Sequence, residues 1–363
     1  MFDLDTTTQS DFKLTERCVG HEKQEQHLLT LFEQNSLPHA FIFSGPDGIG
    51  KSMIAMQLTK FLFKYGIEEE EGLFGEAAPR EFSSLSIPDE DKLHHYMSVG
   101  TYADFLHIQR EYDAKTNKRD ATLKVEAIRK IEPFLRKKSS TGGWRVIIIE
   151  DAECMNRSAQ NGLLKILEEP PENVMIILIT HRIGQLITTI RSRSHVLEFD
   201  GLSQTHIQAI ISDKDLNISA EQNEILSQIT GGSVGDMVSF LKENGFEVFD
   251  KIIKCFGRSG SDIYALSNSL SGAQNDKQYR QFVMIVVWLS RALCFFKARD
   301  TQQLPSMLQV KQIENLYDSS TLDKLVELSD RTQNLLNTTE RANLDRRDAV
   351  RNAFLMIHQY STK

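Results

Sequence analysis

The octapeptide "GPDGIGKS" (residues 45–52) governs the interpretation of this sequence, because it matches the pattern G-x-x-x-x-G-K-[ST] in full. A short apolar run ending in glycine, "AFIFSG" (40–45), precedes it, as expected of a buried strand that runs into a turn. The segment that follows, "KSMIAMQLTKFLF" (51–63), has apolar residues at helical spacing. Strand, glycine loop and helix in this order predict a phosphate-binding P-loop rather than a chance glycine turn.

Each residue type in this loop suits a nucleotide. Gly45, Gly48 and Gly50 allow backbone N–H groups to curl around phosphate oxygens, and the following helix adds its positive dipole end. Lys51 is predicted to reach the β and γ phosphates, and Ser52 to ligate magnesium. The ligands expected here are therefore ATP and Mg²⁺. The predicted cofactor-binding residues are Gly45, Pro46, Asp47, Gly48, Ile49, Gly50, Lys51 and Ser52.

Strand-like and helix-like segments alternate through the first 200 residues, which predicts a right-handed parallel α/β sheet. Residues 64–100 contain a run of four glutamates and little periodicity, and we expect them to form an inserted surface loop, although a mobile linker would have the same pattern. After Phe199 only helical patterns remain, with a small helical unit at 201–248 and further helices over 249–363. The predicted strands are 40–45, 104–109, 144–151, 174–180 and 195–199, and the predicted helices of this region are 21–34, 51–63, 123–138 and 156–171.

The apolar strand "WRVIIIED" ends in two acids, Glu150 and Asp151. In P-loop ATPases such a strand delivers an Asp to magnesium, usually followed by a Glu that activates water. Here the order is reversed, so Glu150 would take the metal position and Asp151, one methylene shorter, that of the base. Because catalysis tolerates little misplacement, we expect turnover to suffer more than binding. The alternative is a strand-end pair that only caps or forms salt bridges.

Two basic features have both a functional and a plain interpretation. In "TIRSRSHVLEF" (189–199), Arg191 and Arg193 precede a strand and would point to opposite faces if the segment is extended. They are either solvated or include an arginine finger aimed at a phosphate across a subunit interface. The stretch 115–138 has nine Lys or Arg against three acids. It is either the solvated face of a helix or a contact for nucleic acid or a partner.

Composition sets further limits. The chain has 363 residues and a net charge of 42 − 50 = −8, so any DNA contact requires a local basic face. The four cysteines are far apart and form no CxxC pair, which argues against a zinc site. The N-terminus is acidic and polar, unlike a signal peptide, and we expect a cytoplasmic protein. The apolar run 282–296 contains Arg291 and is expected to be a buried helix rather than a membrane span.

Three segments in this order, "LPHAFIFSGPDGIGKS", "GGWRVIIIEDAECMNRSAQNGLLKILEEPPE" and "TIRSRS", resemble the clamp-loader branch of AAA+ proteins and, among its members, the delta-prime subunits of bacterial DNA polymerase III. The block "NRSAQNGLLKILEEPPE" is far more specific than a P-loop alone. The resemblance covers roughly residues 19–55 and 102–203; the C-terminal third matches only in being helical.

The resemblance implies an AAA+ ATPase domain at 1–200, with its insert at about 64–100, a helical lid at 201–248 and a helical collar at 249–363. Such collars join five subunits, including gamma/tau and delta, in a ring that opens the sliding clamp and places it on primed DNA. It also implies that Arg193, within the Ser-Arg-Cys motif, is the finger for the neighbouring subunit's ATP site. Thr180 falls at or next to the sensor 1 position. No contact with a membrane is implied.

Some positions depart from the family pattern. Ser194 replaces the usual cysteine, and Gly235 in "GGSVGDM" (231–237) stands where active relatives carry the sensor 2 arginine. The swapped acids and Gly235 favour a component of the DNA polymerase (nucleotidyltransferase) holoenzyme with weak ATPase activity and no polymerase chemistry of its own. Two alternatives stay open: a gamma/tau-like motor subunit that hydrolyses ATP, and an unrelated P-loop ATPase that remodels a protein partner.

Overall fold

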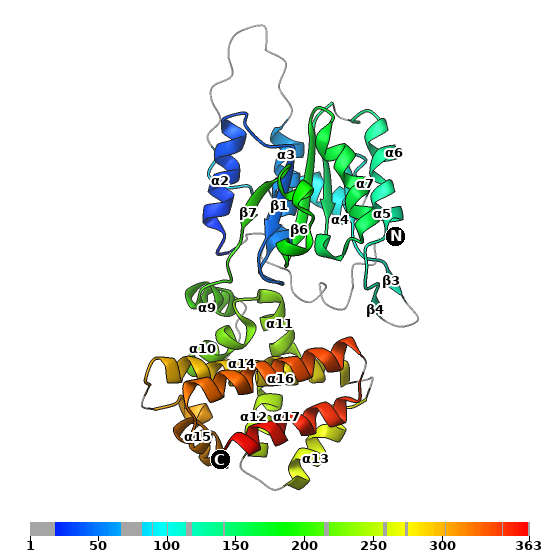
Figure 1. Ribbon diagram of the computed structural model, residues 1–363. Helices are drawn as coiled ribbons and strands as arrows, with labels where there is room; N and C mark the ends of the chain where they lie inside the picture. The colour runs from blue at the N-terminus through cyan, green and yellow to red at the C-terminus, as the bar shows by residue number, and fades with distance from the viewer. Residues whose placement is uncertain are drawn as a thin grey trace. The chain divides into compact units, whose positions relative to one another are not determined.

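The computed structural model describes residues 19–361, apart from short segments within that span. The segments outside the description are 67–81, 89, 100, 114–117, 141, 214–217, 257–259, 273–274, 302 and 343. The chain forms two compact units, the first ending at residue 216 and the second starting at residue 217. The first contains a parallel β-sheet with helices, and the second contains helices in the part described (Figure 1). The α/β fold followed by a helical region is therefore confirmed.

Five parallel strands form the main sheet, in the order β2-β5-β6-β1-β7. Every residue of β5 and β6 is buried, as expected of central strands covered on both faces. All five strands lie within the predicted segments. Their bounds are β1 Ala40–Ser44, β2 Phe105–Ile108, β5 Arg145–Ile149, β6 Val174–Thr180 and β7 His195–Glu198.

Helices cover both faces of the sheet, because alternate strand residues point to opposite sides (Figure 1). On one face, Phe41 and Phe43 of β1 pack in a cluster with Leu58 of α3. On the other, Ile42 packs in a cluster with Leu163 of α7. The first layer contains α2 Glu22–Glu33, α3 Lys51–Tyr65 and α4 Lys92–Ser98, and the second contains α5 Val125–Arg129, α6 Ile131–Arg136, α7 Arg157–Glu168 and α8 Thr188–Arg191.

Smaller elements complete the unit. The strands β3 Tyr112–Asp113 and β4 Lys118–Arg119 pair as a separate antiparallel ribbon. Two 3₁₀ turns, η1 Ala152–Cys154 and η2 Ile183–Gln185, follow β5 and β6. The helix α9 Gln204–Asp213 belongs to this unit.

Local sequence signals set the helix boundaries. The Asn156 side chain accepts a hydrogen bond from the backbone N–H of Ala159 at 2.8 Å and so caps α7. That helix ends at Glu168, directly before the Glu169-Pro170-Pro171 stop, as predicted. The predicted helix at 123–138 restarts as α6, with Pro133 in the first turn, where its missing N–H is least needed.

The predicted surface loop at 64–100 is wrong for the part that the structure describes. Leu85, Ile87 and Met97 are buried, and α4 lies within this segment. An irregular chain can bury single side chains without any repeat, so the absence of periodicity concealed this contribution to the core. Residues 67–81 lie outside the described part.

Every regular element in the described part of the second unit is a helix. Its helices are α10 Ala220–Thr230, α11 Val234–Lys242, α12 Gly245–Phe256, α13 Gly260–Ser269, α14 Asp276–Ala298, α15 Lys311–Ser319, α16 Leu322–Arg341 and α17 Arg346–Ser361, with the short turn η4 Ser306–Leu308. The predicted boundary at 248/249 falls inside α12. The division into a lid and a collar stays a prediction.

The helix α14 is long and apolar enough to cross a membrane by length and composition alone. Half of its apolar window is buried inside the unit, where Phe282 and Leu289 have almost no exposed surface. It packs against α16, and Ser290 lies 3.3 Å from Ser329, oxygen to oxygen. This packing agrees with the buried helix that was predicted.

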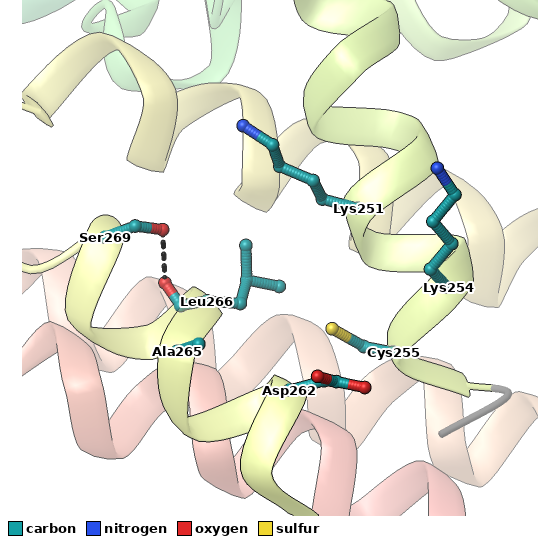
Figure 2. Close-up of a pocket in the computed structure, with 7 residues that line it drawn as sticks. All are labelled: Lys251, Lys254, Cys255, Asp262, Ala265, Leu266 and Ser269. Carbon is teal, nitrogen blue, oxygen red and sulfur yellow. Dashed lines mark hydrogen bonds between the residues drawn. The ribbon is translucent and has the colours of Figure 1, made fainter. Parts of the chain in front are cut away.

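A pocket of about 330 Å³ lies between α12 and α13 (Figure 2). Cys255 and Leu266 point into it, while Lys251, Lys254 and Asp262 contribute charge of both signs. The hydroxyl of Ser269 donates to the carbonyl of Leu266 at 2.8 Å on its rim. No predicted site residue lines this pocket.

The chain after β7 crosses very close to the start of the P-loop. A Cβ atom at Gly45 would lie 2.1 Å from the carbonyl oxygen of Phe199. We expect Gly45→Ala to destabilise the α/β unit by about 1–3 kcal/mol, because backbone must move to relieve the overlap. Thermal unfolding in a Trp288→Phe background, followed by the fluorescence of Trp144, measures this. Gly184→Ala is the control, because no atom lies within 4 Å of its added Cβ, and a change beyond about 0.5 kcal/mol is not expected.

Candidate nucleotide-binding site

The sheet brings the predicted motifs together at one edge. Because parallel strands present their carboxyl ends at the same edge, the loops after β1, β6 and β5 are neighbours in that order. Ser44, at the end of β1, is level with Thr180 at the end of β6. The P-loop and the acids Glu150 and Asp151 therefore flank the end of β6.

Lys51 is buried and fully engaged. Its ammonium donates to the carbonyl oxygens of Gly45, at 2.8 Å, and Pro46, and to Nδ1 of His181 at 3.1 Å. Burial lowers the pKa of Lys51, and nearby carboxylates, with Asp47 the strongest, act in the opposite direction. The helix α3 begins at Lys51 after Gly50, whose φ of 107° requires glycine. The first turn of a helix leaves backbone N–H groups available to an anion.

Ser52 and Glu150 form a pair of oxygen ligands. The Ser52 hydroxyl donates to Oε2 of Glu150 at 2.9 Å, and Oε1 of Glu150 lies 3.4 Å from Nε2 of His107. A hydroxyl and a carboxylate at this spacing fit the oxygen coordination that Mg²⁺ prefers. The predicted metal residues therefore lie together.

Asp151 is held from both sides. Its Oδ2 accepts from Nε of Arg110 at 2.8 Å, and its Oδ1 lies 3.2 Å from Nε2 of His181. The hydrogen bond with His181, followed by that with Arg110, lowers the pKa of Asp151 to about 2 despite partial burial. A carboxylate with this pKa is a weak base at neutral pH. Its backbone has a φ of 50°, a left-handed conformation that Asp tolerates better than most residues.

Thr180 itself does not present its hydroxyl to the loop. It is fully buried, its Oγ1 accepts from the backbone N–H of Arg182 at 3.1 Å, and its carbonyl accepts from Gly45 N–H at 3.3 Å. The adjacent His181 reaches both Lys51 and Asp151 instead. Burial lowers the pKa of His181, but the hydrogen bond with Asp151 and the charge of Asp47 outweigh it, so the net pKa is raised.

Sequence reasoning missed His107, Arg110 and His181. All three lie near strand ends at this edge: His107 is within the last two residues of β2, Arg110 follows β2, and His181 directly follows β6. A polar residue at a strand's carboxyl end was the available signal, but only the sheet order shows which of them meet.

Asp151, Glu153 and His181 place one ligand atom each within 4.8 Å of one another, a spacing that a metal ion could use. Lys51 has only N–H donors, so its contact with Nδ1 of His181 makes that nitrogen an acceptor and puts the ring proton on Nε2. A protonated Nε2 donates to a carboxylate and cannot ligate a metal. The contacts of His181 therefore favour a hydrogen-bonded cluster.

Arg193 is not part of this edge. It lies between α8 and β7, where its guanidinium contacts Oε1 of Glu168 at 3.0 Å and donates to the carbonyl of Thr189 at 3.1 Å. His195, two residues later, is level with Phe41 in β1, so β7 still has to run about 10 Å before it reaches the level of the P-loop. Arg193 thus lies toward the opposite edge from its own nucleotide loop.

The condition under which Arg191 and Arg193 would point to opposite faces, an extended segment, is not met. The helix α8 runs to Arg191, Ser192 is also helical, and the N–H of Arg193 donates to the carbonyl of Ile190 at 3.1 Å. A single helical turn is too short to show a period in the sequence. Gly235 lies in α11 of the second unit.

A glycine loop between β1 and α3, beside two acids that follow a neighbouring parallel strand, defines the P-loop class of nucleotide-binding folds. The model of one family, described as "DNA polymerase III, delta subunit", matches residues 20–203, which is just over half of the chain. The chain belongs to this DNA polymerase III delta/delta-prime family. Membership removes the alternative of a P-loop protein unrelated to replication.

Parts of this chain are similar to individual proteins and to a solved structure. Subunit delta' of DNA polymerase III from Pseudomonas aeruginosa is 29% identical over 155 residues, which are 43% of this chain and 41% of that protein. Subunit tau from Bacillus subtilis is 27% identical over 233 residues, 63% of this chain and 37% of that protein. The chain thus spans about two fifths of the length of these relatives. A gamma-subunit-related protein from Thermotoga maritima superposes with a TM-score of 0.46 at 16% identity, over 92% of this chain and 99% of that one.

The depressed pKa of Asp151 gives a stability that depends on pH. Its folded pKa of about 2 is below the usual 3.8, so its contribution is complete above pH 4 or so and is lost as pH falls toward 2. We expect Asp151→Asn to lower the free energy of unfolding by about 2 kcal/mol at pH 7, with a smaller difference at pH 3. Urea unfolding in a Trp288→Phe background, where Trp144 is the remaining tryptophan, reports on the α/β unit.

Asp120→Asn is the matched control for this measurement. Asp120 forms an ion pair with the exposed Lys124 at 2.8 Å, and exposed pairs contribute little. A difference between Asp151→Asn and the parent that stays constant from pH 7 to pH 3 would contradict the proposed cause.

Proposed function

We propose that this chain is a delta-prime-like subunit of a bacterial DNA polymerase III clamp loader. In this proposal it binds ATP and Mg²⁺ without hydrolysing ATP efficiently, and it supplies Arg193 to the ATP site of a neighbouring subunit. The main support is Asp151: both oxygens of the residue at the base position are held by cationic or donor groups, Arg110 and His181.

Several features support slow hydrolysis. A general base works best with a pKa near the working pH, and the pKa of Asp151 is about 2. To orient water, Asp151 would also have to give up a contact with Arg110 or His181. The reversed order of the acids and the glycine at position 235 act in the same direction.

Several features support ATP binding. The loop is complete, Lys51 is directed into it, and Ser52 and Glu150 lie 2.9 Å apart, oxygen to oxygen. When bound, Mg²⁺ would neutralise phosphate charge, and Ser52 and Glu150 are the residues of this chain that would hold it. The same intact set favours a gamma/tau-like motor as the second candidate function, and the rate of turnover decides between the two.

The position of Arg193 supports action in trans. It lies toward the edge of the sheet opposite its own P-loop, on an exposed turn, so its guanidinium is available to another molecule. The partners in this proposal are the gamma/tau and delta subunits in a five-membered ring, the sliding clamp, and primed DNA through the complex. The location is the cytoplasm, where replication takes place in bacteria.

The isolated chain should bind ATP and turn it over very slowly. Titration with a fluorescent ATP analogue measures binding, and phosphate release by the purified chain measures turnover. Lys51→Ala should abolish binding, because it removes the charge that holds the β and γ phosphates. Turnover as fast as that of a complete clamp loader would favour the motor function instead.

Arg193→Ala should act on the neighbouring subunit. We expect this variant to stay folded, bind its own nucleotide and assemble, while ATP hydrolysis by the reconstituted clamp loader falls by up to about 10³-fold at the affected site. Arg193→Lys should not restore the rate fully, because an ammonium lacks the planar fork of donors. The measurement is DNA- and clamp-stimulated ATP hydrolysis together with clamp loading.

Two control variants separate a finger from a general effect of charge. Glu168→Gln removes the carboxylate that contacts Arg193 but keeps the guanidinium, so the rate should be retained. Arg191→Ala removes a cation two residues away and should leave hydrolysis unchanged. Equal effects of Arg191→Ala and Arg193→Ala, or no effect of either, would rule out Arg193 as the finger.

A further inference from the structure

The three N–H donors of the Lys51 ammonium are all directed at protein acceptors, which leaves none for a phosphate. A lysine ammonium has three N–H donors, and here three acceptors take them: the carbonyl oxygens of Gly45 and Pro46, and Nδ1 of His181. At least one of these contacts must break before Lys51 can bind a phosphate oxygen fully. Only the contact with His181 comes from a side chain, so only that one can be altered by substitution.

His181 connects Lys51 to Asp151. Because Lys51 can only donate, Nδ1 of His181 is the acceptor and Nε2 carries the proton. That proton points to Oδ1 of Asp151, 3.2 Å from Nε2, while Oδ2 of Asp151 accepts from Arg110. One imidazole thus contacts both the residue expected to bind phosphate and the residue at the base position. We call Lys51, His181 and Asp151 the His181 clasp.

The imidazole is held in place by its backbone. The N–H of His181 donates to Oε1 of Glu153 at 3.2 Å. The preceding residue, Thr180, is the buried last residue of β6 and accepts from Gly45 N–H. His181 is therefore fixed to the sheet and to the first residue of the P-loop, and its contacts are not those of a loose surface side chain.

We propose that the His181 clasp restrains Lys51 in the nucleotide-free protein, so that ATP binds only by opening it. The inference rests on the proposed ATP site and concerns its regulation. Opening the clasp frees Lys51 for the phosphates and at the same time takes away the Lys51 donor to Nδ1, which fixes the tautomer of His181 that faces Asp151. His181 is a positioning residue in this proposal: it lowers the affinity for ATP and links occupancy of the loop to the environment of Asp151.

Two substitutions separate the two halves of the clasp. In His181→Asn the amide lies near the position of Nδ1, so contact with Lys51 is retained and contact with Asp151 is lost. In His181→Gln the amide lies near the position of Nε2, so contact with Asp151 is retained and contact with Lys51 is lost. Both variants are neutral, polar and smaller than or similar in size to histidine.

The full-length chain and both variants are titrated with a fluorescent, non-hydrolysable ATP analogue in the presence of Mg²⁺. We expect His181→Gln to bind about 3- to 10-fold more tightly than the parent, as one net hydrogen bond to Lys51 no longer has to be broken. The affinity of His181→Asn should be within about twofold of that of the parent, because its contact with Lys51 is retained. A twofold change is smaller than the increase in affinity expected from the loss of one such hydrogen bond. Equal affinity of the parent and His181→Gln, or tighter binding by His181→Asn alone, would overturn the proposal.

A second readout does not depend on nucleotide affinity. In the parent chain labelled with ¹⁵N-histidine at pH 8.5, His181 should be the Nε2-protonated tautomer with a hydrogen-bonded Nδ1, because Lys51 can only donate to that nitrogen. Its signal is assigned by its absence from His181→Gln. The analogue should shift the Nδ1 resonance toward that of a free acceptor nitrogen.

The two readouts distinguish failure of the clasp from failure of the ATP site. A mixture of tautomers at His181 without nucleotide would overturn the clasp, whatever the affinity for ATP. If neither the parent nor any variant binds the analogue, the proposed ATP site is wrong and the regulatory role of the clasp is overturned with it. Binding by His181→Gln but not by the parent would be the strongest support.

Discussion

The hydrogen-bonded pairing of β6 with β1 on one side and β5 on the other is the constraint on which the candidate site depends. Ser44 lies level with Thr180, and Ile149 lies level with Leu178. Three chain segments that are far apart in sequence therefore leave the sheet side by side, with the ends of β1 and β5 each about one strand spacing, roughly 5 Å, from the end of β6. If this register slipped by one residue, the side chains of the slipped strand would point to the opposite face of the sheet, and the contacts of the site would be lost.

This constraint explains what the sequence could predict. The P-loop, all five strands of the main sheet and the stop of α7 each had a local signal: a complete motif, an apolar run or a pair of prolines. Ser52 and Glu150 were both predicted as magnesium ligands, Ser52 from the P-loop motif and Glu150 from the acids that end an apolar strand. Their 2.9 Å contact agrees with that pairing, although the nucleotide and the metal themselves stay predictions.

The residues that were missed belong to no motif, apolar run or proline stop. Arg110 meets Asp151, 41 positions away, only because β2 pairs with β5. His181 meets Lys51 across 130 positions through the pairing of β6 with β1. The short helix α8 and the buried residues of the segment around Leu85 were also missed, since neither is long or regular enough to produce a period.

The contact between Arg193 and Glu168 has a consequence for assembly. The side chains are 36% and 50% exposed, so water already solvates this pair, and such pairs contribute little, about 0–1 kcal/mol. Glu168 therefore restricts the conformations of the Arg193 side chain but stabilises the paired conformation only weakly. For the proposed finger this means that part of the entropic cost of ordering the Arg193 side chain is met before the subunits assemble. Leaving Glu168 for a phosphate of the neighbouring subunit then costs almost no interaction energy.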